Sequence, residues 1–179
     1  MFFATTQYPG YIIGFQFMSE LGVGPGLSSP LFNIGLLMIG INLSDLSYNF
    51  IRFLRKENSN IHFIRFNMVF SILGGFSLAL VGFFPQISFL MGIIHFIVAC
   101  SFFINFPILI IGISILMLKS KQFNKFQSSF GFFVWIPFVI FLVTGFPLIE
   151  WIAVFILITW VIIVLFPFVF NWLKLIIIL

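Results

Sequence analysis

Charge and cysteine are both scarce in this sequence. Eight Lys or Arg and four Asp or Glu make up 7% of its 179 residues, against about a quarter in soluble domains. The single cysteine, Cys100, excludes an intrachain disulfide and a thiolate metal cluster, and we expect it to be a small core residue. The few cations are spread along the chain and form no concentrated basic surface, so we expect no nucleic-acid partner. No motif indicates a cofactor.

Apolar residues, by contrast, are abundant: 62% of the chain is hydrophobic, and Phe alone occurs 30 times. Mean hydropathy is +1.27. A helix needs about 20 apolar residues to cross a hydrocarbon core, and five segments are that long, near residues 31–54, 63–84, 89–118, 129–147 and 150–173. We therefore predict an all-α, polytopic transmembrane helix bundle with five spans, forming a single domain over residues 31–179.

The positions of the basic residues predict how this bundle is oriented. They occur at alternate breaks between the apolar segments and near the C-terminus: Arg52, Arg55, Lys56, Arg65, Lys119, Lys121, Lys125 and Lys174. Cytoplasmic loops of membrane proteins retain Lys and Arg. We expect these eight residues to be inner-face anchors in the cell (plasma) membrane, with the N-terminus outside and the C-terminus inside.

Residues 1–30 differ from the rest of the chain. They contain three Pro-Gly or Gly-Pro steps, which break a helix before it can span a membrane. They also lack the charged start of a signal peptide. We predict that this segment is a Pro/Gly-rich flap on the outer face.

Polar residues inside the predicted spans indicate how the helices pack. They are Asn42, Asp45, Asn67, Ser71 and Asn105. Asn42 and Asp45 share one face of the first span, and we expect them to contact the polar and small face of residues 67–75 on the second. Hydrogen bonding between helices is favoured over conduction of a substrate as the reason for these residues.

Several short motifs also occur in a characteristic order. The positions are Ser19, Leu21 and Gly22; Phe32, Asn33 and Gly35; Gly82, Phe84 and Pro85; His95; and Glu150. Over nearly the whole chain this order resembles the small multi-pass membrane family known as domain of unknown function 998. A looser similarity to the Frag and DRAM-type membrane proteins suggests a lipid-related or trafficking setting.

The sequence departs from that family in two places. Members usually have one further span before the Tyr-Pro-Gly-Tyr segment, so the resemblance implies either a truncated start or a five-span variant of a six-helix bundle. Members often carry Arg after the final Glu, whereas Trp151 follows Glu150 here. The resemblance implies no established activity.

Four residues in the outer half are candidates for chemistry: Ser19, Glu20, His95 and Glu150. His95 lies about 10 Å deep at 1.5 Å per residue, where an ionisable group is costly to bury. We expect its imidazole to lie within hydrogen-bonding reach, directly or through one water, of the flap near Ser19 and Glu20, or of Glu150. A structural role is favoured over a general base, a Ser-His-acid hydrolase or a metal site, and no catalytic or metal-binding residue is assigned.

Three functions remain open from the sequence. The first is a structural or accessory component, such as a subunit of a larger membrane complex. The second is an outer-leaflet protein that binds or modifies lipid, and the third is a small transporter. Membrane lipids and other membrane-protein subunits are the expected partners, and an enzyme is the less favoured reading.

Overall fold

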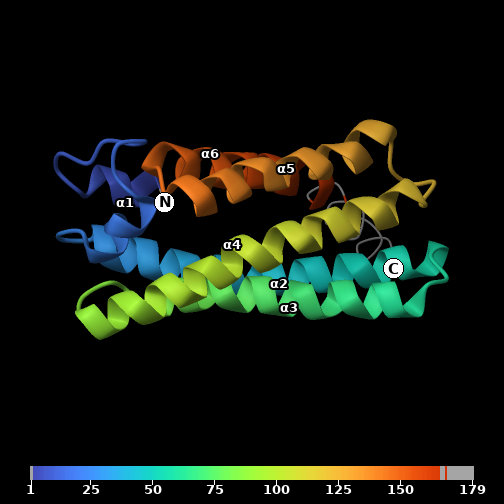
Figure 1. The fold of residues 1–179 in the computed structure, drawn as a ribbon, viewed down its shortest axis with the longest axis horizontal. Coiled ribbons are helices and arrows are strands. Elements are labelled where there is room, and N and C mark those ends of the chain that lie inside the picture. Colours follow the sequence, from blue (N-terminus) through green and yellow to red (C-terminus); the bar gives the residue numbers. More distant parts are fainter. Residues whose placement is uncertain (1, 166–167, 169–179) are drawn as a thin grey trace, which may run out of the picture.

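The computed structural model describes residues 2–165 and 168, and within them the protein is an α-helical bundle (Figure 1). Five helices are long and apolar enough to cross a membrane. They are α2 (Ser28–Leu54), α3 (Ile61–Phe83), α4 (Phe89–Leu118), α5 (Lys125–Thr144) and α6 (Pro147–Trp160), with α6 continued by the π-helical turn η3 (Val161–Leu165). This confirms the predicted all-α bundle with five spans, the architecture of a multi-pass membrane protein.

Four of the five spans, all but α4, begin earlier than the hydropathy pattern predicts, and the starts of α5 and α6 have a clear local cause. α5 starts at Lys125 because Asn124 and Gln127 form a capping box, in which the Asn124 side chain accepts from the Gln127 amide at 2.8 Å. α6 starts at Pro147, whose fixed φ suits the first turn of a helix. Between them Gly145, at φ 63°, ends α5 in the left-handed conformation. Of the predicted last span, residues 166–167 and 169–173 lie outside the described part.

Helices adjacent in sequence pack side by side, so the chain runs up and down through the bundle (Figure 1). The closest approach is between α2 and α3. A Cβ added to Gly40 would lie 2.6 Å from the Gly75 carbonyl oxygen, and one added to Gly75 would lie 2.5 Å from the Ser44 Cβ. Small residues therefore set the face on which these two helices meet.

The predicted contact of Asn42 with α3 is wrong, and Asp45 approaches α3 only across a hollow that it lines together with Ile72 and Phe76. The Asn42 and Asp45 side chains are both exposed, and at 100° per residue Asn42 lies 200° around α2 from Gly40. Within residues 2–165, each has hydrogen-bond partners only on its own helix: Asn42 donates to the Met38 carbonyl at 2.7 Å, and Asp45 Oδ1 accepts from Asn49 at 3.0 Å. The small residues, rather than the polar ones, face α3 because they allow the backbones to approach.

The other polar residues in the spans lie between α3 and α4. Asn67 is buried against Gly112 and donates to the carbonyl of Phe63, and Ser71 is buried as well. Asn105 donates to Ser101 Oγ at 3.0 Å, and that hydroxyl shares a 2.8 Å hydrogen bond with Ser77 of α3. This last bond directly joins the two helices.

The two ends of the bundle differ in charge. The basic end comprises η2 (Arg55–Glu57), the loops 58–60 and 119–124, and the helix turns beside them, and it carries every described Lys and Arg. Glu57 ties its loops together by accepting from the Lys121 amide at 3.0 Å and from Gln122 Nε2 at 2.7 Å. The opposite, flap end comprises residues 2–27, the turn 84–88 and residues 145–146. Lys174 lies outside the described residues.

Candidate functional site

The flap, residues 2–27, contains the short helix α1 (Phe2–Thr6) and the 3-10 helix η1 (Met18–Val23) and is anchored to α6 by polar contacts. The Met18 amide donates to Glu150 Oε2 at 2.8 Å, and Trp151 Nε1 donates to the Gln16 carbonyl at 3.2 Å. The rings of Tyr11 and Trp151 meet edge to face at 6.2 Å. Two consecutive side chains at the start of α6 therefore hold the flap, Glu150 as acceptor and Trp151 as donor.

A second set of bonds anchors the flap to α2. Asn33 Nδ2 and the Ser29 hydroxyl both donate to the Gly22 carbonyl, at 2.8 and 2.7 Å. A Cβ at Gly22 would lie 2.7 Å from Asn33 Oδ1, so this close contact requires glycine. Because α2 and α6 are both engaged, the flap bridges the two sides of the bundle at this end.

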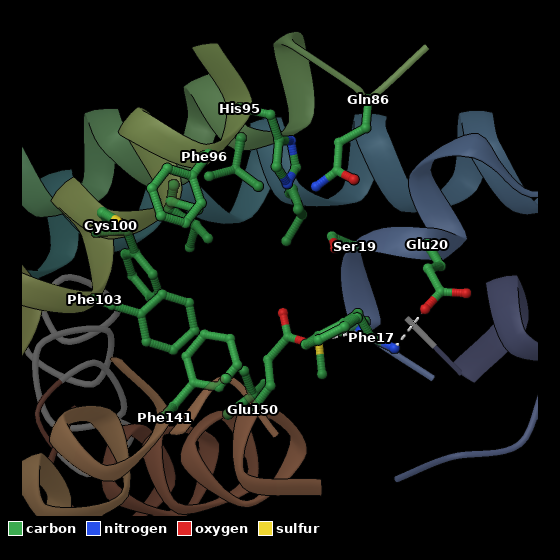
Figure 2. A pocket seen from close by; sticks show the side chains of 18 of the residues that line it. Phe17, Ser19, Glu20, Gln86, His95, Phe96, Cys100, Phe103, Phe141 and Glu150 are labelled. Atoms are coloured by element: carbon green, nitrogen blue, oxygen red, sulfur yellow. Dashed lines mark hydrogen bonds between the residues drawn. The ribbon is translucent and has the colours of Figure 1, made fainter. Parts of the chain in front are cut away.

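Beneath the flap lies a cavity of about 370 Å³, within the range of about 300–1,000 Å³ typical of small-molecule sites. It is enclosed by the flap, α2, α3, α4, α5 and α6. Figure 2 shows its labelled lining residues: Phe17, Ser19, Glu20, Gln86, His95, Phe96, Cys100, Phe103, Phe141 and Glu150. Cys100 is thus a half-buried cavity residue rather than the core residue expected from the sequence.

Aromatic rings close the cavity toward the middle of the bundle. Phe103 of α4 lies 4.7 Å from Phe141 and 5.3 Å from Phe138, both of α5, measured between ring centroids. Phe102 adds a further contact to Phe138 at 6.1 Å. The cavity consequently has an aromatic floor, and its polar groups lie at the flap end.

His95 is held by the turn between α3 and α4. Its Nδ1 lies 2.8 Å from the carbonyl oxygen of Phe84, which ends α3. A carbonyl only accepts, so Nδ1 carries the hydrogen, and in the neutral imidazole the lone pair is then on Nε2. The ring is 3% exposed and points into the cavity (Figure 2). The Phe84 bond therefore orients the imidazole with Nε2 as an acceptor for a ligand.

Glu150 contributes a carboxylate on the facing side. One oxygen is taken up by the Met18 amide, and the other points toward the cavity (Figure 2). The residue is 8% exposed. Glu150 thus has two roles that the geometry separates, one oxygen holding the flap and one available to a molecule in the cavity.

All four residues singled out by the sequence line this one cavity: Ser19, Glu20, His95 and Glu150. Among the described residues the direct partner of His95 is the Phe84 carbonyl, which the sequence did not predict. Reach to the flap or to Glu150 through one water stays a prediction. Glu20 instead accepts from the Phe17 amide at 2.9 Å and from Gln16 Nε2 at 3.3 Å, within the flap.

The hydrogen bonds of Ser19, His95 and the acids can be compared with those of a catalytic relay. In the part of the chain that the structure describes, no hydrogen bond connects Ser19 to His95 or His95 to an acid, so a Ser-His-acid relay is not formed. Nor do three His, Cys, Asp or Glu side chains of the described residues gather closely enough to hold a metal ion. The polar groups instead line a space that could bind a molecule.

Several lining residues were not apparent from the sequence. Gln86, Phe96 and Cys100 line the cavity, and the Phe84 carbonyl orients His95. The short turn 84–88 between two apolar segments was the available signal, since it must bring the end of α3 beside the second turn of α4. A backbone carbonyl leaves no trace in a residue pattern, so its role required the structure.

Comparison with known proteins adds no relative to this description: no protein-family model, curated protein or solved structure matches the chain.

Proposed function

We propose that this protein binds one amphipathic lipid in the cavity beneath the flap, at the outer leaflet of the membrane. The observation that carries the proposal is the polarity gradient of the cavity. His95, Glu150 and Ser19 lie at its flap end, and an aromatic floor closes it toward the bundle centre. Such a site suits a molecule with a polar head and an apolar chain. The lipid-binding alternative is therefore favoured over an accessory role.

The charges of the site define the headgroup. The cavity contains carboxylates and an imidazole, whereas the described Lys and Arg all lie at the basic end. A phosphate headgroup would meet Glu150 without a compensating cation, a repulsive arrangement. A hydroxyl can donate to either Glu150 or the Nε2 of His95, and an amine can donate to both. The proposed ligand is accordingly a lipid with an uncharged hydroxyl-bearing or an amino headgroup.

The ligand would enter from the side, between α4 and α5. Phe96 of α4 and Leu142 of α5 both line the cavity, and they are 68% and 39% exposed. Residues that line a cavity and also face outward mark its opening. In a membrane-spanning bundle this opening faces the acyl chains, so a lipid reaches the site without leaving the bilayer.

Transport is less consistent with the arrangement. Asp45, one of the polar span residues for which conduction was the alternative, is exposed and lines the hollow between α2 and α3 rather than the cavity. The aromatic floor also separates His95 from the basic end. The described residues therefore offer a site that opens laterally and is closed toward the basic end, which favours binding over conduction.

Filling the cavity tests the proposal. Ala99 lines the cavity, while Ile97 on the same helix is 61% exposed and outside the lining. Protein purified in native-lipid nanodiscs should retain a specific hydroxyl- or amino-lipid by mass spectrometry. We expect Ala99→Trp to lower its occupancy at least tenfold, and the matched control Ile97→Trp to retain it. Equal lipid composition in both variants, or recovery of bulk phospholipid alone, would refute the proposal.

A further inference from the structure

One face of α2 carries a regular stripe that no other described element covers. The stripe, here called the α2 seam, has residues spaced alternately four and three apart along the helix: Leu31, Gly35, Met38, Asn42, Asp45, Asn49 and Arg52. Every member is exposed or partly exposed. At 100° per residue they lie within a sector of about 100°. This is the 3.5-residue period of a helix that packs along its length against another helix.

The middle of the seam is polar where a lone helix would meet acyl chains. Asn42 and Asp45 lie near the centre of the 27-residue helix α2. In the described part of the chain their hydrogen bonds stay within α2, and these leave the second carboxyl oxygen of Asp45 and further amide positions of Asn42 open. Asp within a membrane span ordinarily faces protein or water rather than lipid. The seam thus requires a partner with hydrogen-bonding groups at the same depth.

We propose that this partner is a second copy of the same chain, packed with its α2 parallel along the seam. Two copies inserted with the same topology are related by a two-fold axis along the membrane normal, so Asn42 and Asn49 meet their own counterparts. The second carboxyl oxygen of Asp45 can then accept from an Asn side chain of the other copy, which keeps the two carboxylates from facing each other. The Asn side chain both donates and accepts, and it is therefore complementary to itself. An Asn at such a seam position is also a known determinant of two-stranded, in-register pairing.

Two further features of the seam suit close pairing. A Cβ at Gly35 would meet nothing within 4 Å, so the space beside this glycine is open. A second helix can therefore approach the α2 backbone closely there. Beside the polar centre, a hollow of about 360 Å³ lies between α2 and α3. Its lining includes Asp45, Tyr48 and Phe76, and it can receive a side chain of the partner copy.

The pairing is independent of lipid binding. The cavity uses Leu36 of α2, which lies about 180° around that helix from Asp45, and Phe32, which lies about 140° from Asp45. Loss of the dimer would therefore leave lipid occupancy unchanged, and Ala99→Trp would leave the dimer intact. The two proposals fail separately.

Disulfide trapping in native membranes tests the seam. In a Cys100→Ala background, single cysteines at Gly35, Met38 and Asn42 should form a disulfide-linked species of twice the chain mass. Leu73 is a control on α3 at similar depth, beside the Gly75 contact, and is 45% exposed. We expect at least tenfold more trapping at the seam positions than at Leu73→Cys. Comparable trapping at Leu73, or an adduct with a polypeptide of different mass, would overturn the proposal.

Replacing the polar centre gives a second, cysteine-free readout. Asn42→Leu combined with Asp45→Leu removes the hydrogen-bonding groups from an exposed face, so the fold should be preserved. We expect single-molecule photobleaching in liposomes to shift from two steps to one at dilutions where the wild type is dimeric. A wild type that bleaches in one step at every dilution, or a double variant as dimeric as the wild type, would also overturn the proposal.

Discussion

The helix pair α4 and α5 is packed in opposite ways at its two ends. Toward the basic end Gly131 is pressed against α4, where an added Cβ would lie 3.1 Å from Ile110 Cγ2. Toward the flap end the facing residues are Phe103 and Phe141, and the helices enclose the cavity. Figure 1 shows the two helices diverging in that direction. Side-chain size along one helix pair therefore determines where the bundle is closed and where it is open.

The comparison also extends to charge. The basic end collects the described cations, and the flap end has carboxylates and an imidazole under a polar-anchored flap. One end suits anchoring at the anionic cytoplasmic leaflet. The other has the features of a binding site. The predictions below test this division, beginning with the largest expected effect.

The side of the membrane on which each end lies can be tested by cysteine labelling, which should give an all-or-none result. In a Cys100→Ala background, a cysteine at Gln122 should be inaccessible to an impermeant maleimide added to intact cells, because the Lys-rich loop is expected inside. A cysteine at Gln7, on the exposed flap, should react. Labelling of Gln122→Cys from outside would reverse the assignment and place the cavity in the cytoplasmic leaflet.

The closed end should not tolerate a larger residue. Gly131→Leu inserts a side chain where Ser114 and Trp160 already contact the glycine, so we expect a loss of about 3 kcal/mol or failure to fold. Gly92→Leu is the matched control at the open end, where an added Cβ meets nothing within 4 Å. In detergent, Gly131→Leu should have a lower melting temperature than Gly92→Leu. Equal melting temperatures would contradict the difference in packing between the two ends.

The anchor between flap and bundle should be the next most sensitive point. Glu150→Ala leaves the Met18 amide without its acceptor in a buried site, which costs about 1–3 kcal/mol. Glu150→Gln keeps an acceptor oxygen and should lose less. Limited proteolysis within residues 2–27 measures the effect directly. An unchanged cleavage rate in Glu150→Ala would show that the other flap contacts suffice.

Two substitutions at His95 should separate its contribution to stability from its contribution to lipid binding. His95→Asn can retain a donor toward the Phe84 carbonyl and lacks the second ring nitrogen, so we expect stability to change by less than about 1 kcal/mol. Lipid occupancy by mass spectrometry should nevertheless fall severalfold. His95→Ala should lower both. Full occupancy in His95→Asn would show that Nε2 takes no part in binding.

The smallest effect concerns the Tyr11 hydroxyl, which donates to the Phe17 carbonyl at 2.9 Å. Burial raises the pKa of Tyr11 above its ordinary value of about 10. The stability that the neutral Tyr11 phenol adds to the folded state is thus complete below pH 10. It declines only as pH rises through the higher pKa of the folded state. Tyr11→Phe should reduce stability by about 0.5–1.5 kcal/mol, equally at pH 6 and pH 9. A difference that vanishes by pH 9 would contradict this.

The sequence was a good guide to features that depend on one segment at a time. Span positions follow from local hydropathy, and the basic end follows from the positions of Lys and Arg. The motif residues Ser19, His95 and Glu150 were assigned to one end of the bundle because each lies near the same end of its segment. The helices α5 and α6 begin at Lys125 and Pro147, earlier than predicted, because capping residues set these starts and hydropathy does not measure capping.

The rotation of each helix about its own axis was decided only by the tertiary structure. Hydropathy cannot determine which face of α2 meets α3, since Gly40 and Asn42 occur in the same span. The close backbone contact at Gly40 turned Asn42 and Asp45 outward, against the expectation from polarity. The cavity and the Phe84 partner of His95 likewise arise from several helices together. A single segment carries the information for crossing a membrane, whereas a binding space depends on the side chains of all its neighbours at once.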